Sequence, residues 1–232
     1  MQSTIINVQD TSVKEAVNAY MTKVFGWMAA ALFITAITSY VVASTPMINL
    51  IFGNRILFYG LLIGEVLLVM GIAGAINRLS ISAVTALFVL YSIVNGLTLS
   101  VIFLVFTEGS IVTTFFITSL TFGVMAIMGI ITKHDLTSWG KIFMMALIGL
   151  VIASVVNMFM HSDTLSWICS YAGVLIFTGL TAYDAQKIKN MGTYAIEQGE
   201  NTGKLAISGA LNLYLDFINL FLFLLNLFGR RK

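Results

Sequence analysis

The sequence predicts an all-α integral membrane protein with seven transmembrane helices, and three observations support this fold class. Hydrophobic residues make up 59% of the 232 residues and charged residues only 9%, against about 25% charged residues in an average soluble domain. A soluble fold could not cover so much apolar surface with a polar exterior. The apolar residues also form continuous runs of about 20 residues, the length of a helix that crosses a bilayer. The chain has one proline, Pro46, so long uninterrupted helices are expected.

Seven such runs follow one another along the chain. Strands of a membrane barrel alternate apolar and polar residues over about ten positions, whereas these runs are continuous and longer, so a helical bundle is expected to satisfy their backbone groups in lipid. Polar breaks separate them, the longest at 46–55 and 187–204. The expected helices cover residues 27–44, 57–76, 81–106, 111–132, 142–160, 165–183 and 205–228.

The segment before the first run, residues 1–23, is expected to be a polar arm in the cytoplasm. Its apolar residues recur at helical spacing from Val13 to Tyr20, which is typical of an amphipathic interfacial helix and also of an ordinary lead-in to a membrane helix. We favour the lead-in. The membrane domain is expected over 24–229 and a basic tail over 230–232.

The distribution of Lys and Arg predicts the orientation. With seven crossings, eight of the 12 Lys and Arg residues lie on the amino-terminal side and four on the other side. The positive-inside rule then places the amino terminus in the cytoplasm, in a multi-pass protein of the inner (plasma) membrane. The basic tail is an exception to this rule, and a re-entrant last segment is the alternative that it leaves open.

Three acidic residues lie in or beside the expected helices. An ionised carboxylate in mid-membrane costs at least about 2.5–3.5 kcal/mol, so such residues are rare and usually functional. Glu65 and Asp216 lie well inside the second and seventh expected helices, and Asp184 directly follows the sixth. Glu65 is expected to be protonated or hydrogen-bonded to another helix. Asp184 precedes Lys187 by three residues, which also fits a simple surface pair.

The seventh expected helix carries a polar stripe. Its polar residues follow at steps of three, four, three and seven, which keeps them on one face that should point into the protein. Asparagines can stabilise a bundle through hydrogen bonds between helices, but the acid adds a cost that packing does not require. We therefore favour a functional stripe. It consists of Gly209, Asn212, Asp216, Asn219 and Asn226.

Several classes of function are not expected from the motifs, the cysteine content and the net charge of the sequence. The chain shows no nucleophile–base set, no nucleotide loop and no spacing typical of a metal site, so we expect neither an enzyme nor a resident cofactor. Its single cysteine, Cys169, excludes an intrachain disulfide. A net charge of +2 is too small to predict a nucleic-acid partner.

Four stretches of the chain carry a family resemblance. They are MTKVFGW at 21–27, GEVLLV at 64–69, TGLTAYDAQKI at 178–188 and ALNLYLDFINLF at 210–221. These stretches resemble the Bax inhibitor family, the transmembrane Bax inhibitor motif proteins. The two stretches with an aspartate are the most specific.

The resemblance implies seven helices, with the seventh in the centre and six around it. It also implies that Asp184 and Asp216 meet across the sixth and seventh helices, as in the pH-sensitive calcium leak channels among the bacterial members. In those channels an arginine of the second helix latches the closed state. No arginine lies inside the second expected helix here, and Arg78, directly after it, is the nearest candidate.

We therefore expect a calcium leak gated by protons. Two adjacent carboxyl groups cannot both ionise at low cost, so they share a proton and titrate as one unit. When the proton leaves, the charges repel, and calcium, which prefers oxygen ligands, can bind transiently to Asp184 and Asp216, with Asn212 and Asn219 in support. Calcium is then the transported ion and not a cofactor.

Two alternatives remain. A proton-coupled cation exchanger could use the same acids. A membrane regulator without ion conduction could bind a protease or a stress-response partner, because some bacterial relatives are reported to modulate a membrane protease and eukaryotic ones suppress cell death. The expected partners are calcium, protons, the lipid bilayer and a membrane protease, with a monomer favoured over an oligomer.

Overall fold

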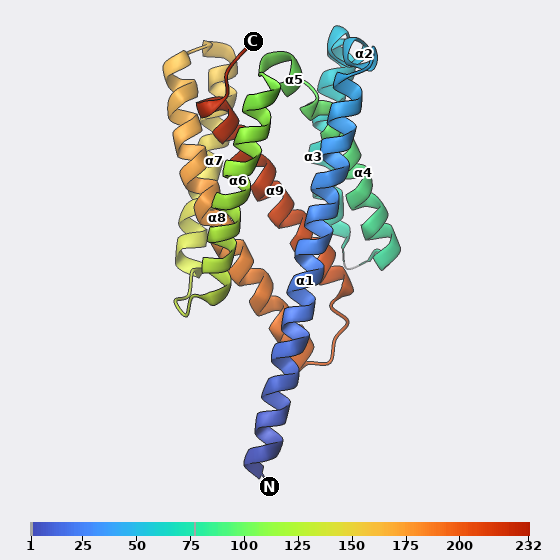
Figure 1. Ribbon diagram of the computed structural model, residues 1–232, viewed down its shortest axis with the longest axis vertical. Helices are drawn as coiled ribbons and strands as arrows, with labels where there is room; N and C mark the ends of the chain where they lie inside the picture. The colour runs from blue at the N-terminus through green and yellow to red at the C-terminus, as the bar shows by residue number, and fades with distance from the viewer. Residues whose placement is uncertain (1, 77) are drawn as a thin grey trace. The chain divides into compact units, whose positions relative to one another are not determined.

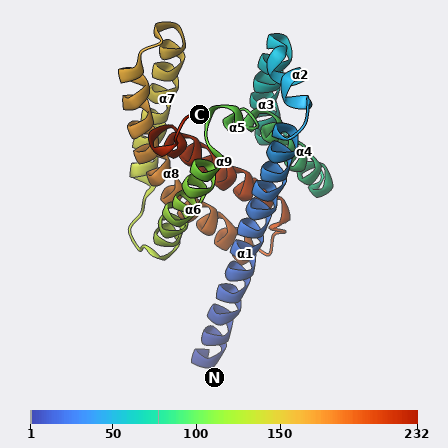
Figure 2. The same cartoon turned by 45° about the horizontal axis from the view of Figure 1, so that its top comes forward.

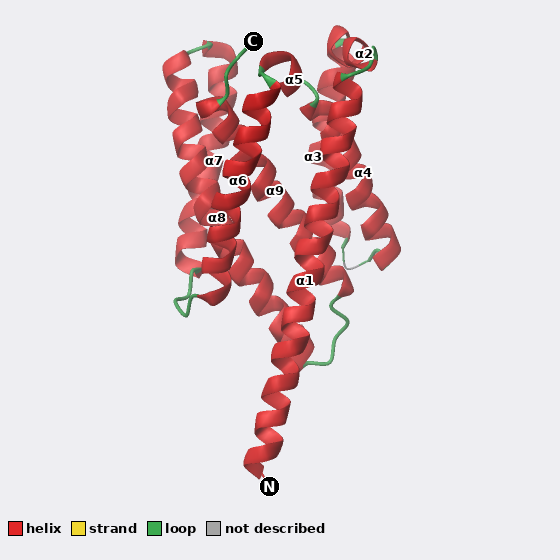
Figure 3. Cartoon of the chain, in the orientation of Figure 1, coloured by secondary structure: helices red, strands yellow, loops and turns green. Residues whose placement is uncertain are grey.

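The structure is a computed structural model that describes residues 2–76 and 78–232, with the side chains of residues 12–76 and 78–232. These residues form helices, and the one β pairing among them is an isolated bridge between Phe106 and Arg231 (Figure 3). The helices in Figure 1 are α1 (Gln2–Ala43), α2 (Met47–Gly53), α3 (Arg55–Ala75), α4 (Ile81–Leu99), α5 (Ile102–Val105), α6 (Glu108–Ile131), α7 (Thr137–Met160), α8 (Asp163–Glu197) and α9 (Gly203–Phe228).

Seven segments of the described chain are long and apolar enough to cross a membrane. They are α1 from Ser12 onward, α3, α4 together with α5, and the four helices α6 to α9. The predicted all-α fold with seven spanning helices is therefore confirmed. The central position of the seventh spanning helix, α9, stays a prediction, as does the division into an arm, a membrane domain and a tail. The side chains of residues 1–11 of the arm lie outside the described residues.

The chain divides into two compact units, and both α8 and α9 pass from one unit to the other. Unit 1 comprises Met1–Leu104 and Ile188–Tyr214, and unit 2 comprises Val105–Lys187 and Leu215–Lys232. Each unit is therefore assembled from two separate stretches of sequence.

In unit 1, α4 packs against both α1 and α3. Gly96 of α4 allows the closest approach to α1, because a Cβ atom there would lie 2.8 Å from the carbonyl oxygen of Thr35. The short helix α2 closes one end of the unit, where Ile48 and Ile51 pack against Val42 of α1. The predicted break at 46–55 thus contains a helix of its own.

In unit 2, the first part of α8 packs between α6 and α7. A Cβ atom on Gly129 of α6 would overlap the main-chain carbonyl of Ala182, and one on Gly140 of α7 would overlap the ring of Tyr183. Figures 1 and 2 both show α7 beside the first part of α8. Two glycines therefore bring the segment just before Asp184 into close contact with its neighbours.

Two predicted boundaries were wrong. The break expected at 187–204 is mostly helical, since α8 continues to Glu197. The cause is tertiary contact, because Ile188 and Ala195 are buried and Gly192 packs directly under the ring of Tyr20 on α1. The reverse occurs at 81–106, where α4 ends at Leu99 and the chain continues as the separate short helix α5.

Candidate functional site: a pair of buried aspartates

Asp184 of α8 and Asp216 of α9 lie together in unit 2, where their carboxyl groups are hydrogen-bonded to each other. Asp216 is 5% exposed and Asp184 is half-buried. An ionised carboxylate has no donor, so a hydrogen bond between two carboxyl groups requires one of them to hold a proton. A hydrogen bond between these carboxyl groups therefore joins α8 to α9 only while the pair holds a proton.

One oxygen of the pair has no partner in the described part of the chain. Oδ2 of Asp216 is fully buried and accepts no hydrogen bond there. Leaving a buried acceptor unsatisfied costs about 1–3 kcal/mol, and more when the group is charged. A proton shared with Asp184, a water molecule or a cation would satisfy this oxygen.

Aromatic side chains of α9, the helix that carries Asp216, pack against α6 and α8. Phe217, the residue after Asp216, packs edge-on against Phe115 and Phe122 of α6, with ring centroids 5.6 and 5.4 Å away. Further along α9, Phe223 stacks on Phe177 of α8, with centroids 5.8 Å apart. The surroundings are apolar, and Lys187, one turn after Asp184, is the cation whose charge interacts with that carboxylate.

The third acid, Glu65, lies in unit 1 and is bound differently. Its Oε1 accepts a hydrogen bond of 2.5 Å from the hydroxyl of Thr98, and its Oε2 accepts one of 3.2 Å from the amide of Asn95. Both partners are on α4, so the expectation that Glu65 is hydrogen-bonded to another helix is confirmed.

The network continues beyond Glu65 to a buried tyrosine. The hydroxyl of Tyr214 donates to Oδ1 of Asn95 at 2.9 Å and lies 2.7 Å from the hydroxyl of Thr35 on α1. The ring of Tyr214 has no exposed surface and packs edge-on against Phe88 and Tyr91. Glu65 is thus one end of a polar network through three helices, α3, α4 and α9, that reaches α1.

Comparison with known proteins identifies the relatives of this chain. A family model described as "Inhibitor of apoptosis-promoting Bax1" matches residues 17–232. The chain belongs to the Bax inhibitor family. It is 46% identical over 221 residues to the inner membrane protein YbhL of Escherichia coli strain K12, covering 94% of each chain. An uncharacterized protein of Borreliella burgdorferi is 45% identical over 216 residues, covering 93% of each chain.

The family and the seven apolar helices together make this a multi-pass inner membrane protein. A relative from Rickettsia prowazekii, the uncharacterized protein RP147, is 42% identical over 224 residues, which cover 94% of this chain and 92% of the relative. The likeness to these Bax inhibitor family proteins therefore extends over almost the whole chain.

The asparagines of the polar stripe make different contacts, and a shared function of the stripe stays a prediction. The amide of Asn226 donates to the hydroxyl of Ser170 at 2.6 Å, which is a packing contact between α9 and α8. The amide of Asn219 donates to the carbonyl of Leu215 in its own helix at 2.8 Å. Asn212 is half-buried and belongs to unit 1. Among the described residues no group of three or more His, Cys, Asp or Glu side chains could hold a metal ion.

The sequence predicted a role for Arg78 but none for Tyr214. Arg78 lies exposed in the turn after α3, in unit 1, and its role as a latch stays a prediction. Sequence reasoning missed Tyr214, because a tyrosine in an apolar run resembles any other core aromatic. Its position on the same helix as Asp216, two residues earlier, was the available signal.

Proposed function

We propose that this Bax inhibitor family protein is a calcium leak channel of the inner membrane, opened by loss of a proton from the Asp184–Asp216 pair. The observation that carries the proposal is the hydrogen bond between two carboxyl groups of which one, Asp216, is buried and keeps an oxygen without a partner in the described chain. Calcium is the transported ion, and the amino terminus faces the cytoplasm.

In the protonated state the shared proton joins α8 to α9. Two interacting carboxyl groups lose their protons in macroscopic steps that belong to the pair and not to either residue. When the shared proton leaves, two negative charges face each other in apolar surroundings, where their repulsion is screened less than in water. The joint between the two helices then loosens, so calcium flux is expected to rise as the pH rises.

Calcium can replace the proton in the open state. It binds six to eight oxygen atoms at about 2.3–2.6 Å, and the pair supplies up to four carboxylate oxygens, with Asn219 and water as further ligands. Such a site is incomplete and therefore weak. Weak binding suits conduction, because an ion that is held tightly cannot leave. In this proposal Glu65 holds α3 to α4 through its hydrogen bonds to Thr98 and Asn95.

Calcium influx into proteoliposomes, measured from pH 5.5 to pH 8, tests the gate. The wild-type protein should conduct more calcium at high pH than at low pH. Asp184→Asn and Asp216→Asn each leave at most one ionisable carboxyl group and should flatten this pH dependence. Asp135→Asn, which removes an acid from the exposed loop between α6 and α7, is the matched control and should keep it.

The same preparation separates the channel from its alternatives. A pH gradient that drives calcium uphill would indicate a proton-coupled exchanger. Absence of calcium flux at every pH would contradict both forms of transport and leave the partner-binding regulator. An unchanged pH profile in both Asn variants would remove the pair from the gate.

A further inference from the structure

A polar pocket of about 460 Å³ lies in unit 2, away from the aspartate pair, where α8 begins and α9 ends. Its lining includes an acid, Asp163, and a base, Arg231, together with Ser166, Trp167 and Asn226. The pocket therefore presents one negative and one positive group to the same space. A ligand with both charges would match it better than an anion or a cation alone.

The arginine is held in place by the end of the chain. The last residues pair with the segment before α6, since the amide of Thr107 donates to the carbonyl of Arg230 at 2.9 Å and that of Lys232 donates to Val105 at 2.9 Å. The basic tail predicted at 230–232 is therefore attached to unit 2 through its backbone.

One side-chain hydrogen bond orients the guanidinium group of Arg231, which is exposed. Nη2 of Arg231 donates to Oδ1 of Asn226 at 3.3 Å, and the amide nitrogen of Asn226 donates to Ser170 at 2.6 Å. A guanidinium group carries five N–H donors in a planar fork that suits phosphate. One bond to Asn226 orients the fork and leaves donors that can bind a phosphate at the pocket.

The acid of the pocket, Asp163, lies in the first turn of α8. A carboxylate at this position interacts favourably with the helix dipole and stabilises the helix. An ionised carboxylate accepts several hydrogen bonds at once. Together with the hydroxyl of Ser166, it can accept the N–H groups of a primary ammonium ion.

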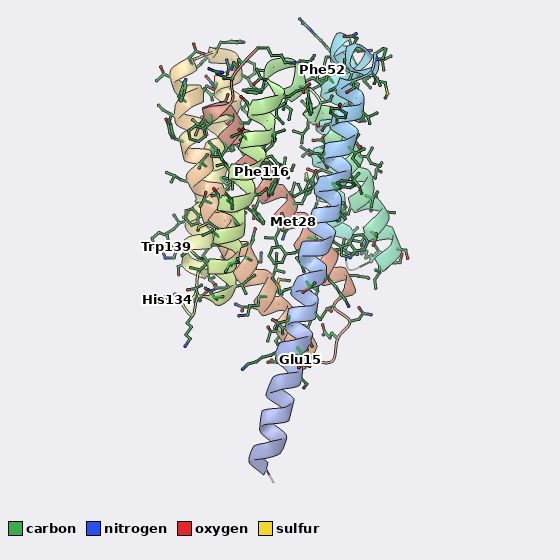
Figure 4. The ribbon with its side chains drawn as sticks, in the orientation of Figure 1. Glu15, Met28, Phe52, Phe116, His134 and Trp139 are labelled. Carbon is green, nitrogen blue, oxygen red and sulfur yellow. The ribbon has the colours of Figure 1, made fainter. Side chains whose placement is uncertain are left out.

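Aromatic residues place the pocket at the membrane–water interface. Tryptophan and tyrosine gather at the two membrane surfaces, and Trp167 and Tyr171, 51% and 57% exposed, lie one turn apart at the start of α8. Trp139 is exposed at the other end of α7, as Figure 4 shows. Since α7 has 24 residues, it spans about 36 Å, enough to cross the bilayer between these two tryptophans.

An apolar face continues from the pocket toward the membrane interior. Ile168 and Leu175 of α8 are 58% and 71% exposed, and their spacing of seven puts them on one side of the helix. Side chains of this kind are suited to contact acyl chains. The ligand of the pocket should therefore have a charged head and apolar tails.

We propose that this pocket binds the headgroup of an ethanolamine phospholipid, with the phosphate on Arg231 and the primary ammonium on Asp163 and Ser166. A choline headgroup carries no N–H donor for Asp163. A glycerol headgroup has no cation, so its phosphate would leave the acid unpaired. The proposal does not depend on calcium transport, because it uses none of the residues of the aspartate pair.

Native mass spectrometry of the full-length, delipidated protein tests the proposal, with ethanolamine, choline and glycerol phospholipids of identical acyl chains supplied in equal amounts. The wild-type protein should retain the ethanolamine lipid in preference to the other two. Arg231→Gln should weaken this binding about tenfold, the typical effect of losing a charge-assisted hydrogen bond. Arg230→Gln changes the neighbouring arginine, which is outside the lining of the pocket, and should have no effect.

The second variant keeps the test valid if Arg231→Gln does not fold. Asp163→Asn, on the other helix, should reduce binding of the ethanolamine lipid to the level of the choline lipid. Equal retention of the three lipids by the wild-type protein, or equal losses in the two arginine variants, would overturn the proposal. If soluble glycerophosphoethanolamine displaced the lipid at the same concentration, the acyl chains would contribute nothing to binding, and the proposal that the ligand is a lipid would be wrong.

Discussion

Glu65 in unit 1 and Asp216 in unit 2 are both carboxylic acids in membrane-spanning helices, but their surroundings differ in kind. Each oxygen of Glu65 accepts a hydrogen bond from a neutral donor on α4. Asp216 faces a second acid, and one of its oxygens is buried without a partner in the described chain. The first acid is matched by donors that carry no charge, whereas the second is matched by a group that can itself become negative.

The difference extends to what each site does when a proton is gained or lost. The hydroxyl of Thr98 lies within hydrogen-bond distance of both Glu65 and the carbonyl of Asn95, at 2.5 and 3.0 Å. It can donate to an ionised Glu65, or accept from a protonated Glu65 while donating to Asn95, without any movement of heavy atoms. The aspartate pair has no such alternative, because removal of its proton leaves two charges in contact. Glu65 can therefore keep its contact with α4 in either protonation state, whereas the pair cannot keep its hydrogen bond once the proton is lost.

The largest expected effect concerns the packing that positions the pair. Gly129→Ala puts a methyl group on the main-chain carbonyl of Ala182, two residues before Asp184. Overpacking of this kind costs about 1–3 kcal/mol, so the free energy of unfolding should fall by that amount, and the pH profile of calcium flux should change with it.

Gly123→Ala is the control on the same helix, because nothing lies within 4 Å of a Cβ atom there. Equilibrium unfolding in mixed micelles compares the two variants. Equal stability of the two would contradict the close contact of α6 with α8.

The next effect breaks the network of unit 1 at its most buried point. Tyr214→Phe removes the hydroxyl between Asn95 and Thr35, so Oδ1 of Asn95 loses its donor, whereas the hydroxyl of Thr35 keeps the carbonyl of Ser92 as a partner. Hydrogen bonds between membrane helices contribute about 0.6 kcal/mol on average and up to about 1.7 kcal/mol, and a loss near the upper value is expected here because the site is dry. Tyr171→Phe, at an exposed position, is the matched control and should be neutral in the same unfolding measurement.

A smaller effect separates the two acids directly. Glu65→Gln keeps an acceptor for Thr98 but puts a second amide donor against Asn95, so about one hydrogen bond is lost, or roughly 0.6 kcal/mol. The pH dependence of calcium flux should remain that of the wild-type protein. A Glu65→Gln variant with a flattened pH profile would show that Glu65 belongs to the gate and would end the contrast with Asp216.

The smallest expected effect is on stability and concerns Asp135, an acid in the exposed loop before α7. The side chain and backbone of Thr137 donate to Asp135 at the start of α7, at 2.6 and 2.9 Å, and these hydrogen bonds lower the pKa of Asp135. A lowered pKa in the folded state gives stability that is present above the pKa of the unfolded chain and is lost as the pH falls through the folded value. Asp135→Asn should therefore melt slightly earlier than the wild-type protein at pH 7, with the difference disappearing in acid.

Much of this arrangement could be predicted from the sequence, and the exceptions have a common cause. Length and apolarity alone determine the number of spanning helices, because the bilayer imposes one span length on all of them. The contact between Asp184 and Asp216 was inferred from a family resemblance, since no local pattern joins residues on different helices. The extension of α8 to Glu197 was missed because charged residues such as Lys187 and Lys189 end the apolar run, and contacts with other parts of unit 1, such as that of Gly192 with Tyr20 on α1, explain why the segment is helical. Tyr214 was missed for the same reason, as its partners lie on other helices.

The division of the chain into interleaved stretches has a consequence for synthesis on the ribosome. Unit 1 needs residues 188–214 as well as its first 104, and Tyr214 supplies the bond that links Asn95 to Thr35. During translation, its amino-terminal helices are therefore in the membrane before Tyr214 can donate to Asn95. More than 80 intervening residues must first be translated and inserted. No single cut in the polypeptide separates the two units, and a nascent chain that stalls before α9 has neither unit complete.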